Sequence, residues 1–145
     1  MSSTSSNRRA PRWLALVNPI NRWLLARGIG PASQYLLSVA GRRTGLVRTT
    51  PVAVVTVDGD RYVVAGFAGS DWVANARAAR RARLSRGRSV EEVTLTELPI
   101  ADRGPVLRAF AGQVRGGRPF LGVSAHASDA AFQDAAAAHP IFRVD

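Results

Sequence analysis

The sequence contains no cysteine and no lysine, and only two of its 145 residues are histidines. A chain without cysteine can form neither a disulfide bond nor a thiolate metal site, which fits a reducing compartment. The lone histidines, His126 and His139, are 13 positions apart and do not make a metal centre. No apolar run reaches the roughly 18 residues that a membrane-spanning helix requires. We therefore expect a cytoplasmic protein without a metal ion.

The first residues are polar and basic, and they lack the apolar core of a signal peptide. Six of the first seven residues are polar, the exception being the initial methionine. We therefore expect residues 1–10 to form a disordered tail. A secretory signal would need a continuous apolar segment next, and Asn18, Pro19 and Arg22 interrupt it. Residues 11–145 have the length and composition of one globular domain.

Arginine supplies all 20 basic residues, and it is distributed unevenly along the chain. Residues 1–88 hold 15 arginines against 3 aspartates, whereas residues 89–145 hold 5 arginines against 7 acidic residues. The basic surface is therefore built by the first two thirds of the sequence. Such an asymmetry predicts an anionic partner, which is a nucleic acid, an anionic membrane surface or a phosphorylated ligand.

The pattern of apolar residues predicts a mainly antiparallel sheet with a few helices. Strands are expected at 34–40, 51–57, 61–67, 81–85, 89–98 and 141–144. Helices are expected at 11–29, 71–80, 102–115 and 128–138. The strands come in hairpins, with turns at Asp58-Gly59 and at residues 86–88, and not in alternating βα units. This argues against a Rossmann fold and favours an α+β protein with a small closed or half-closed β-barrel.

One stretch, residues 41–51, places three arginines and three hydroxyl side chains between two predicted strands. Guanidinium groups are permanently charged and match phosphate and carboxylate oxygens, and glycine lets a ligand approach the backbone closely. The stretch is either a binding site for a polyanionic ligand or a solvated basic turn. A second anion site is expected at the start of the helix at 71–80, where Ser70 is a good N-cap residue and the first amides point outward.

Three motifs together resemble the deazaflavin-dependent nitroreductase family. They are Gly41-Arg42-Arg43-Thr44-Gly45-x-x-Arg48-x-x-Pro51, residues 58–64, and Trp72-x-x-Asn75-x-Arg77, and the similarity is colinear over about residues 12–98. The resemblance implies a split β-barrel oxidoreductase that binds coenzyme F420, an 8-hydroxy-5-deazaflavin with a phosphate-linked oligoglutamate tail. It further implies hydride transfer to an electron-poor acceptor, which is a quinone, an enone or a nitro compound.

The resemblance also implies a set of site residues. Those matching cofactor-binding positions are Arg42, Arg43, Thr44, Arg48, Thr50, Pro51, Ala65, Gly66, Gly69, Ser70, Trp72 and Asn75. The three arginines match positions that contact the tail and phosphate, residues 50–51 run beside the deazaflavin, and residues 65–70 match the loop under the ring. The helix start departs from the family's pattern, since Val73 and Ala76 stand where tyrosine and leucine are frequent.

Because the cofactor carries the hydride, the implied reaction needs no nucleophile or metal site, and none is visible; a proton must come from the protein or from water. Ser70, Tyr62 and His126 are the candidates, and histidine is the residue type best suited to proton transfer near neutral pH. Surface exposure of His126 is the competing interpretation. Trp13, Trp23 and Phe120 line either an acceptor pocket or the core.

Other functions remain open from the sequence. A split barrel can bind FMN or haem, or hold a cofactor without catalysis, because fold does not fix function. The run of arginines at Arg77, Arg80, Arg81, Arg83, Arg86 and Arg88 suits nucleic-acid binding, but it lacks interleaved aromatic residues, and we expect no specific nucleic-acid partner. The tryptophan-bearing stripe of residues 12–27 either packs on the sheet or makes peripheral contact with an anionic membrane. The sequence leaves the oligomeric state undetermined.

Overall fold

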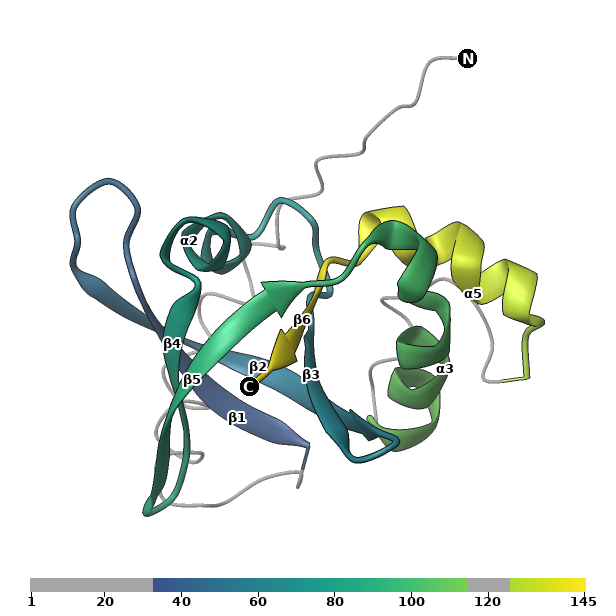
Figure 1. Ribbon diagram of the computed structural model, residues 1–145, viewed down its shortest axis with the longest axis horizontal. Helices are drawn as coiled ribbons and strands as arrows, with labels where there is room; N and C mark the ends of the chain where they lie inside the picture. Colours follow the sequence, from purple (N-terminus) through teal and green to yellow (C-terminus); the bar gives the residue numbers. More distant parts are fainter. Residues whose placement is uncertain (1–32, 115–125) are drawn as a thin grey trace, which may run out of the picture.

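The computed structural model describes residues 33–114 and 126–145 (Figure 1). The predicted tail at residues 1–10, the helix at 11–29 with its membrane contact, and Phe120 lie outside the described residues. The described residues comprise the barrel and the helices that pack on it.

Six strands form a closed barrel in which every neighbouring pair is antiparallel. They are β1 (Gln34–Ala40), β2 (Val47–Val57), β3 (Asp60–Val64), β4 (Arg81–Arg86), β5 (Ser89–Glu97) and β6 (Ile141–Val144). Their order around the barrel is β1-β2-β3-β6-β5-β4, and β4 pairs back with β1. The prediction of an antiparallel barrel with hairpins at Asp58-Gly59 and at residues 86–88 is confirmed.

Helices cover one end and one side of the barrel (Figure 1). They are α2 (Asp71–Ala79), α3 (Gly104–Gln113) and α5 (Asp129–Ala135), with 3-10 turns at Ile100–Asp102 and Ala136–Ala138. Helix α2 lies over the end of the barrel where β1 ends and β2 begins, and α3 packs with α5 along the outside of β2 and β3. Ser128 caps α5 as predicted, because its side chain accepts a hydrogen bond from the Ala131 amide.

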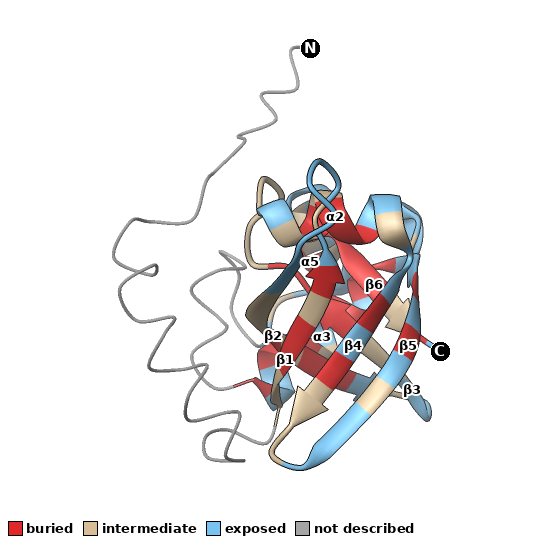
Figure 2. Cartoon of the chain, turned by 90° about the vertical axis from the view of Figure 1, so that its left-hand side faces the viewer, coloured by how far each residue is buried: buried red, intermediate tan, exposed pale blue. Residues whose placement is uncertain are grey.

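Two apolar clusters result, and both follow from residue alternation along the strands. The interior cluster takes alternate residues from all six strands and is completed by Val73 and Ala76 of α2, which are fully buried. The outer cluster joins Val55 and Val64 of the sheet to Leu107 of α3 and to α5. Figure 2 shows the buried positions as red segments within the strands and at α2. The packing of α2 on the interior cluster fixes this helix relative to the barrel rim.

The opposite end of the barrel is closed by charged side chains. Arg61 of β3 donates to the Glu91 carboxylate of β5 at 2.8 Å, and both residues share the alternation of the interior positions. Arg86 of β4 donates to the carbonyl of Gln34 at 2.7 Å. This end also carries the β2–β3 and β4–β5 turns, whereas the end covered by α2 carries the β1–β2 loop.

Several predicted boundaries are wrong, and three of them have a clear local reason. Strand β2 begins at Val47 and not at Pro51, because its polar first residues pair with the end of β1. Strand β3 ends at Val64 and not at residue 67, because its partner β6 begins only at Ile141. The helix expected from Asp102 begins at Gly104, after a 3-10 turn that ends at Asp102.

Candidate functional site

The loop between β1 and β2 is a compact turn that holds its own shape. The Gly41 amide donates to the carbonyl of Leu46 at 2.7 Å, and the Gly45 amide donates to the carbonyl of Gly41 at 2.9 Å. Gly45 has a φ of 73°, a left-handed conformation in which glycine is favoured. A Cβ on Gly41 would lie only 3.1 Å from the Leu46 oxygen, so this position also favours glycine. The loop therefore presents residues 42–44 from a rigid backbone.

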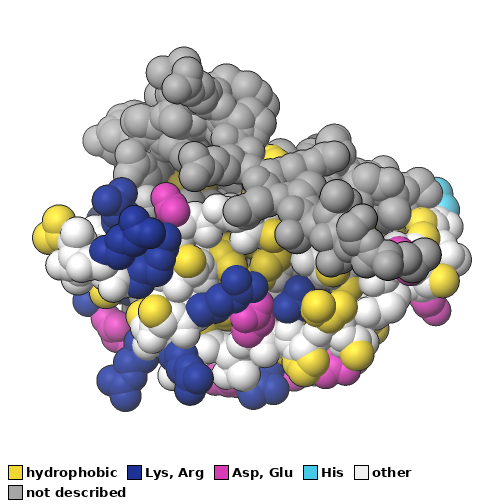
Figure 3. All heavy atoms as spheres, turned by 90° about the horizontal axis from the view of Figure 1, so that it is seen from above, with side chains coloured by type: hydrophobic (Ala, Val, Ile, Leu, Met, Phe, Trp, Pro, Cys, Tyr) yellow, Lys and Arg dark blue, Asp and Glu magenta, His cyan; other side chains and the backbone are white. Residues whose placement is uncertain are grey.

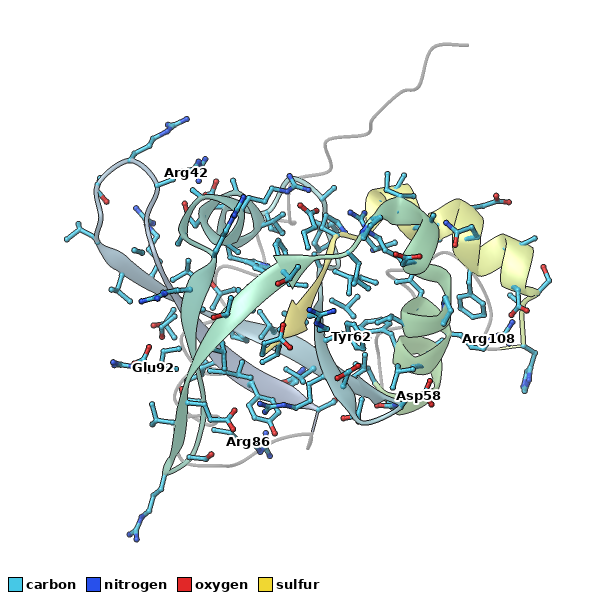
Figure 4. The ribbon with its side chains drawn as sticks, viewed as in Figure 1. Arg42, Asp58, Tyr62, Arg86, Glu92 and Arg108 are labelled. Atoms are coloured by element: carbon cyan, nitrogen blue, oxygen red, sulfur yellow. The ribbon has the colours of Figure 1, made fainter. Side chains whose placement is uncertain are left out.

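Arg42 fastens this loop to α2. Its backbone amide and its guanidinium NH1 both donate to Oδ1 of Asn75, at 3.0 and 2.8 Å. Its NH2 also lies 3.7 Å from the carboxylate of Asp71. Asn75 is only 3 % exposed, so its amide oxygen is a buried acceptor that Arg42 satisfies. Figure 4 shows Arg42 in the loop beside α2. Arg42 thus has internal partners, and its first role is to position the loop.

Arg43 and Arg48 are exposed, as Arg42 is, but differ from it because, within the described residues, their side chains have no hydrogen-bond or ion-pair partner. Arg43 stands in the loop, and Arg48 lies on β2 opposite Val39 of β1. Figure 3 shows basic side chains gathered over this end of the molecule. Two permanently charged donors that lack a protein partner are what a polyanionic ligand would require.

The alternation of β2 separates the predicted site residues into two faces. Thr49 lies on the outer face, where its hydroxyl is 2.8 Å from the hydroxyl of Ser38, and Pro51 shares that face. Arg48 and Thr50 lie on the other face, in line with the residues that enter the barrel interior. Thr50 and Pro51 therefore do not present their side chains to the same ligand group. Extending the alternation of the later β2 residues back to Val47 would have revealed this from the sequence.

The segment between β3 and α2 is anchored to the residues just before β6. The Ala65 amide donates to the carbonyl of Pro140 at 2.9 Å, and the Ala65 carbonyl accepts from Nδ1 of His139 at 3.0 Å. A carbonyl can only accept, so Nδ1 carries the proton. His139 is 4 % exposed. It was not singled out from the sequence, because nothing local links it to a residue 74 positions earlier.

Ser70 occupies the N-cap position of α2, but its side chain does not cap the helix. The hydroxyl instead donates to the carbonyl of Phe67 at 2.9 Å, which tightens the preceding segment. The predicted capping hydrogen bond is therefore wrong, and the first-turn amides of α2 have no side-chain cap. Asp71 supplies a negative charge to this turn, as expected for a helix N-terminus.

The remaining predicted residues occupy separate places. The ring centroids of Trp72 and Phe142 are 5.8 Å apart, and Trp72 is partly buried against the interior cluster. Tyr62 packs against the outer cluster, on the barrel side of α3 (Figure 4), and His126 is exposed. Ser70 precedes α2, so the three candidate proton donors belong to different parts of the fold. Among the residues that the structure describes, no hydrogen bond joins any two of them.

Half of the arginine run proposed for nucleic acid is engaged within the protein. Arg77 makes two hydrogen bonds of 2.8 Å to Glu97, Arg83 pairs with Glu92, and Arg86 donates to the backbone of β1.

In the ranges 33–114 and 126–145 no group of three potential metal ligands comes together. None of the helices in those ranges has the length and apolar character to cross a membrane.

Burial of His139 predicts a pH-dependent stability. Burial lowers the pKa of His139 below its usual value, and the hydrogen bond to Ala65 opposes this only in part. The unfolded chain then binds a proton more readily than the folded one. The free energy of unfolding should be constant above about pH 6.5 and decrease as the pH falls below it.

Urea unfolding between pH 7.5 and pH 5.5 measures how steeply the free energy of unfolding changes with pH, which we call the pH slope. The variant His139→Gln should reduce it, whereas His126→Gln, which changes an exposed ring, should retain it. An unchanged slope in His139→Gln would assign the pH dependence to other groups.

The chain is similar to a known protein family and to several solved structures. The family model described as F420H(2)-dependent quinone reductase matches residues 25–117. No curated protein matches the chain. A solved F420-H2 dependent reductase, FDR-A, is 17 % identical, with a TM-score of 0.56 over 80 % of this chain and 96 % of that one.

Two further solved structures have the same fold. One, described as a domain-swapped dimer, is 17 % identical, with a TM-score of 0.57 over 92 % of this chain and 97 % of that one. The other is a Clostridium acetobutylicum protein related to general stress protein 26, of the pyridoxinephosphate oxidase family. It is 9 % identical, with a TM-score of 0.54 over 86 % of this chain and 80 % of that one. These likenesses confirm the predicted split-barrel fold.

Proposed function

We propose that this chain, which belongs to the F420H(2)-dependent quinone reductase family, transfers hydride from reduced coenzyme F420 to an electron-poor small molecule. Family membership makes the protein an F420-dependent oxidoreductase. The observation that supports the proposed site is the pair Arg43 and Arg48, two exposed guanidinium groups beside a loop that Asn75 holds in place. A quinone is the proposed acceptor, and enones and nitro compounds are alternatives of the same electronic character.

The donor set at this end of the barrel fits the polyanionic tail that the family resemblance implies. Arg43 and Arg48 would hold phosphate and carboxylate groups, and the hydroxyl of Thr50 lies on the same face of β2 as Arg48. A hydrogen bond to a charged group contributes roughly 1.5–3 kcal/mol. Arg42 would act through its hydrogen bonds to Asn75, which keep the loop in place.

Residues 65–70 would support the ring of the cofactor. Small side chains let the backbone approach a planar ligand, and the hydrogen bonds of Ala65 to Pro140 and His139 fix the start of this segment. When bound, the reduced cofactor supplies the hydride from its C5 position. The protein's contribution is to orient the two planar molecules and to exclude water between them.

Ser70 is the proposed source of the proton among the three candidates, because it lies in the segment assigned to the ring. Its hydroxyl donates to the Phe67 carbonyl, so it would act as a relay, passing its proton to the reduced acceptor while taking another from a solvent water. Tyr62 and His126 stand on other elements and would need water to relay a proton.

A side-by-side binding experiment tests the cofactor assignment. Purified protein should bind coenzyme F420 at micromolar concentration or more tightly, whereas FMN and haem should bind more weakly. The reduced complex should then be oxidised by a quinone, with an enone and a nitroaromatic compound measured in parallel. Preferential binding of FMN or haem would favour the alternative cofactor, and binding without turnover would favour a storage protein. Because one protein of this fold is a domain-swapped dimer, the same sample should also be examined by analytical ultracentrifugation.

A further inference from the structure

A cleft lies on the side of α2 that faces away from the β1–β2 loop. Asp71 and Asn75 of α2 face Arg42, whereas Ala76, Arg77 and Arg80 face β5. At about 100° per residue these two sets lie on nearly opposite sides of the helix. The cleft between α2 and β5 has a volume of about 610 Å³, which is within the range of small-molecule sites. None of its lining residues is among the cofactor-binding residues predicted from the sequence.

The cleft is lined by three apolar residues and five polar ones. The apolar residues at its base, Ala76, Leu95 and Phe142, belong to the interior cluster and are each no more than 2 % exposed. Its rim is formed by Arg77, Arg80, Thr94, Thr96 and Glu97. A site for a small organic molecule needs a few polar groups that fix the ligand's orientation, and the side chains of Arg80, Thr94 and Thr96 supply them at this rim.

The charge at the rim is positive. Both carboxylate oxygens of Glu97 accept hydrogen bonds from Arg77 at 2.8 Å, and Arg103 adds a third at 3.1 Å. The hydrogen bonds from Arg77 lower the pKa of Glu97 and outweigh its burial, so this carboxylate stays ionised. Two guanidinium groups therefore share one carboxylate, and Arg80 adds a further positive charge. In the described part of the chain the side chain of Arg80 has no hydrogen-bond or ion-pair partner.

The backbone of Arg80 is held in a conformation that favours glycine. Its φ and ψ are 58° and −5°, the left-handed region in which a helix often ends with glycine. The Arg80 amide donates to Ala76 at 2.9 Å, and its carbonyl accepts from Leu95 at 2.7 Å. The chain thus keeps an arginine where glycine would be less strained. An outlier of this kind points to a role for the side chain.

We propose that this cleft binds a small planar organic anion of the aromatic carboxylate class. The carboxylate lies at Arg80, and the ring occupies the cleft between α2 and β5, against the side chains of its rim. The exposed hydroxyls of Thr94 and Thr96 are available to a second polar substituent.

The probe is 2-naphthoate, compared with its neutral isostere 2-naphthamide, with the full chain free of cofactor. Isothermal titration calorimetry gives the affinity, and amide shifts in ¹H–¹⁵N NMR spectra locate the ligand. The test variant is Arg80→Gly, which suits the left-handed backbone and so preserves the fold. The matched control is Arg88→Gly, which removes an equal charge from an exposed turn that does not line the cleft.

We expect saturable binding of 2-naphthoate at least tenfold tighter than that of 2-naphthamide, with shifts at residues 76–80 and 94–97. Arg80→Gly should lose this preference, and Arg88→Gly should keep it. Equal affinity for the two ligands, wild-type binding by Arg80→Gly, or shifts confined to residues 42–50 would each overturn the proposal.

Discussion

Replacing Arg43 and Arg48 together by alanine is expected to weaken binding of coenzyme F420 by about 3 kcal/mol, on the order of a hundredfold. Each guanidinium is assigned about 1.5 kcal/mol, the lower end of the range for charge-assisted hydrogen bonds, because both side chains are exposed to water. The melting temperature should stay close to that of the wild type, since neither side chain has a partner within the described residues. Fluorescence titration with the cofactor measures the first effect, and thermal unfolding measures the second.

The control for this experiment is Arg81→Ala with Arg88→Ala. These two arginines are also exposed and unpartnered among the described residues, and their loss changes the net charge by the same amount. The control should bind the cofactor nearly as well as the wild type if Arg43 and Arg48 make direct contacts. Equal weakening in both double variants would show that only the general positive field attracts the ligand.

Asn75→Ala is expected to lower the free energy of unfolding by about 2–3 kcal/mol, because it deletes a buried acceptor of two hydrogen bonds and leaves unfilled space. Arg42→Ala should cost less, about 1 kcal/mol, because the backbone amide keeps its bond to Asn75. Cofactor binding should also weaken in Asn75→Ala, since the loop that carries Arg43 loses its attachment to α2. Urea unfolding and hydrogen exchange at residues 41–46 measure these effects.

A double-mutant cycle separates this coupling from unrelated damage. Arg42→Ala and Asn75→Ala in combination should cost less than the sum of the single variants, with a coupling energy of about 1 kcal/mol. Additive effects would mean that Arg42 and Asn75 act independently and that the loop is held by other contacts. Asn75→Asp is a useful third variant, because it keeps an acceptor oxygen for Arg42 and should retain more of the loop's order.

Local patterns predicted most of the barrel correctly. Asp58-Gly59 forms the expected hairpin, and the alternation of residues 90–96 forms the expected half-buried strand. The polar start of β2 was missed because Arg48, Thr49 and Thr50 resemble a turn until their pairing with β1 is known. Hydrogen bonding of both strands, and not residue preference, makes that segment a strand.

The internal role of Arg42 could not be predicted from composition or spacing. An arginine in a basic loop resembles a ligand contact, and only the fold brings Asn75, which is 33 positions later, to its amide and guanidinium. The link between Ala65 and His139 is equally remote in the sequence. Residue types therefore indicated the chemistry of the site, whereas the division between residues that position and residues that bind emerged only in three dimensions.

Strand β6 has a consequence for how the protein folds. It is four residues long, yet it pairs with both β3 and β5 and so closes the barrel between these two strands, which do not pair with each other. The residues just before it hold Ala65, so the segment assigned to the cofactor ring is completed by a contact of high sequence separation. Closing such a long loop is slow compared with forming a local hairpin. During synthesis, the cofactor site would become competent only after β6 has left the ribosome, and the β1–β2–β3 sheet would present an unpaired β3 edge until then.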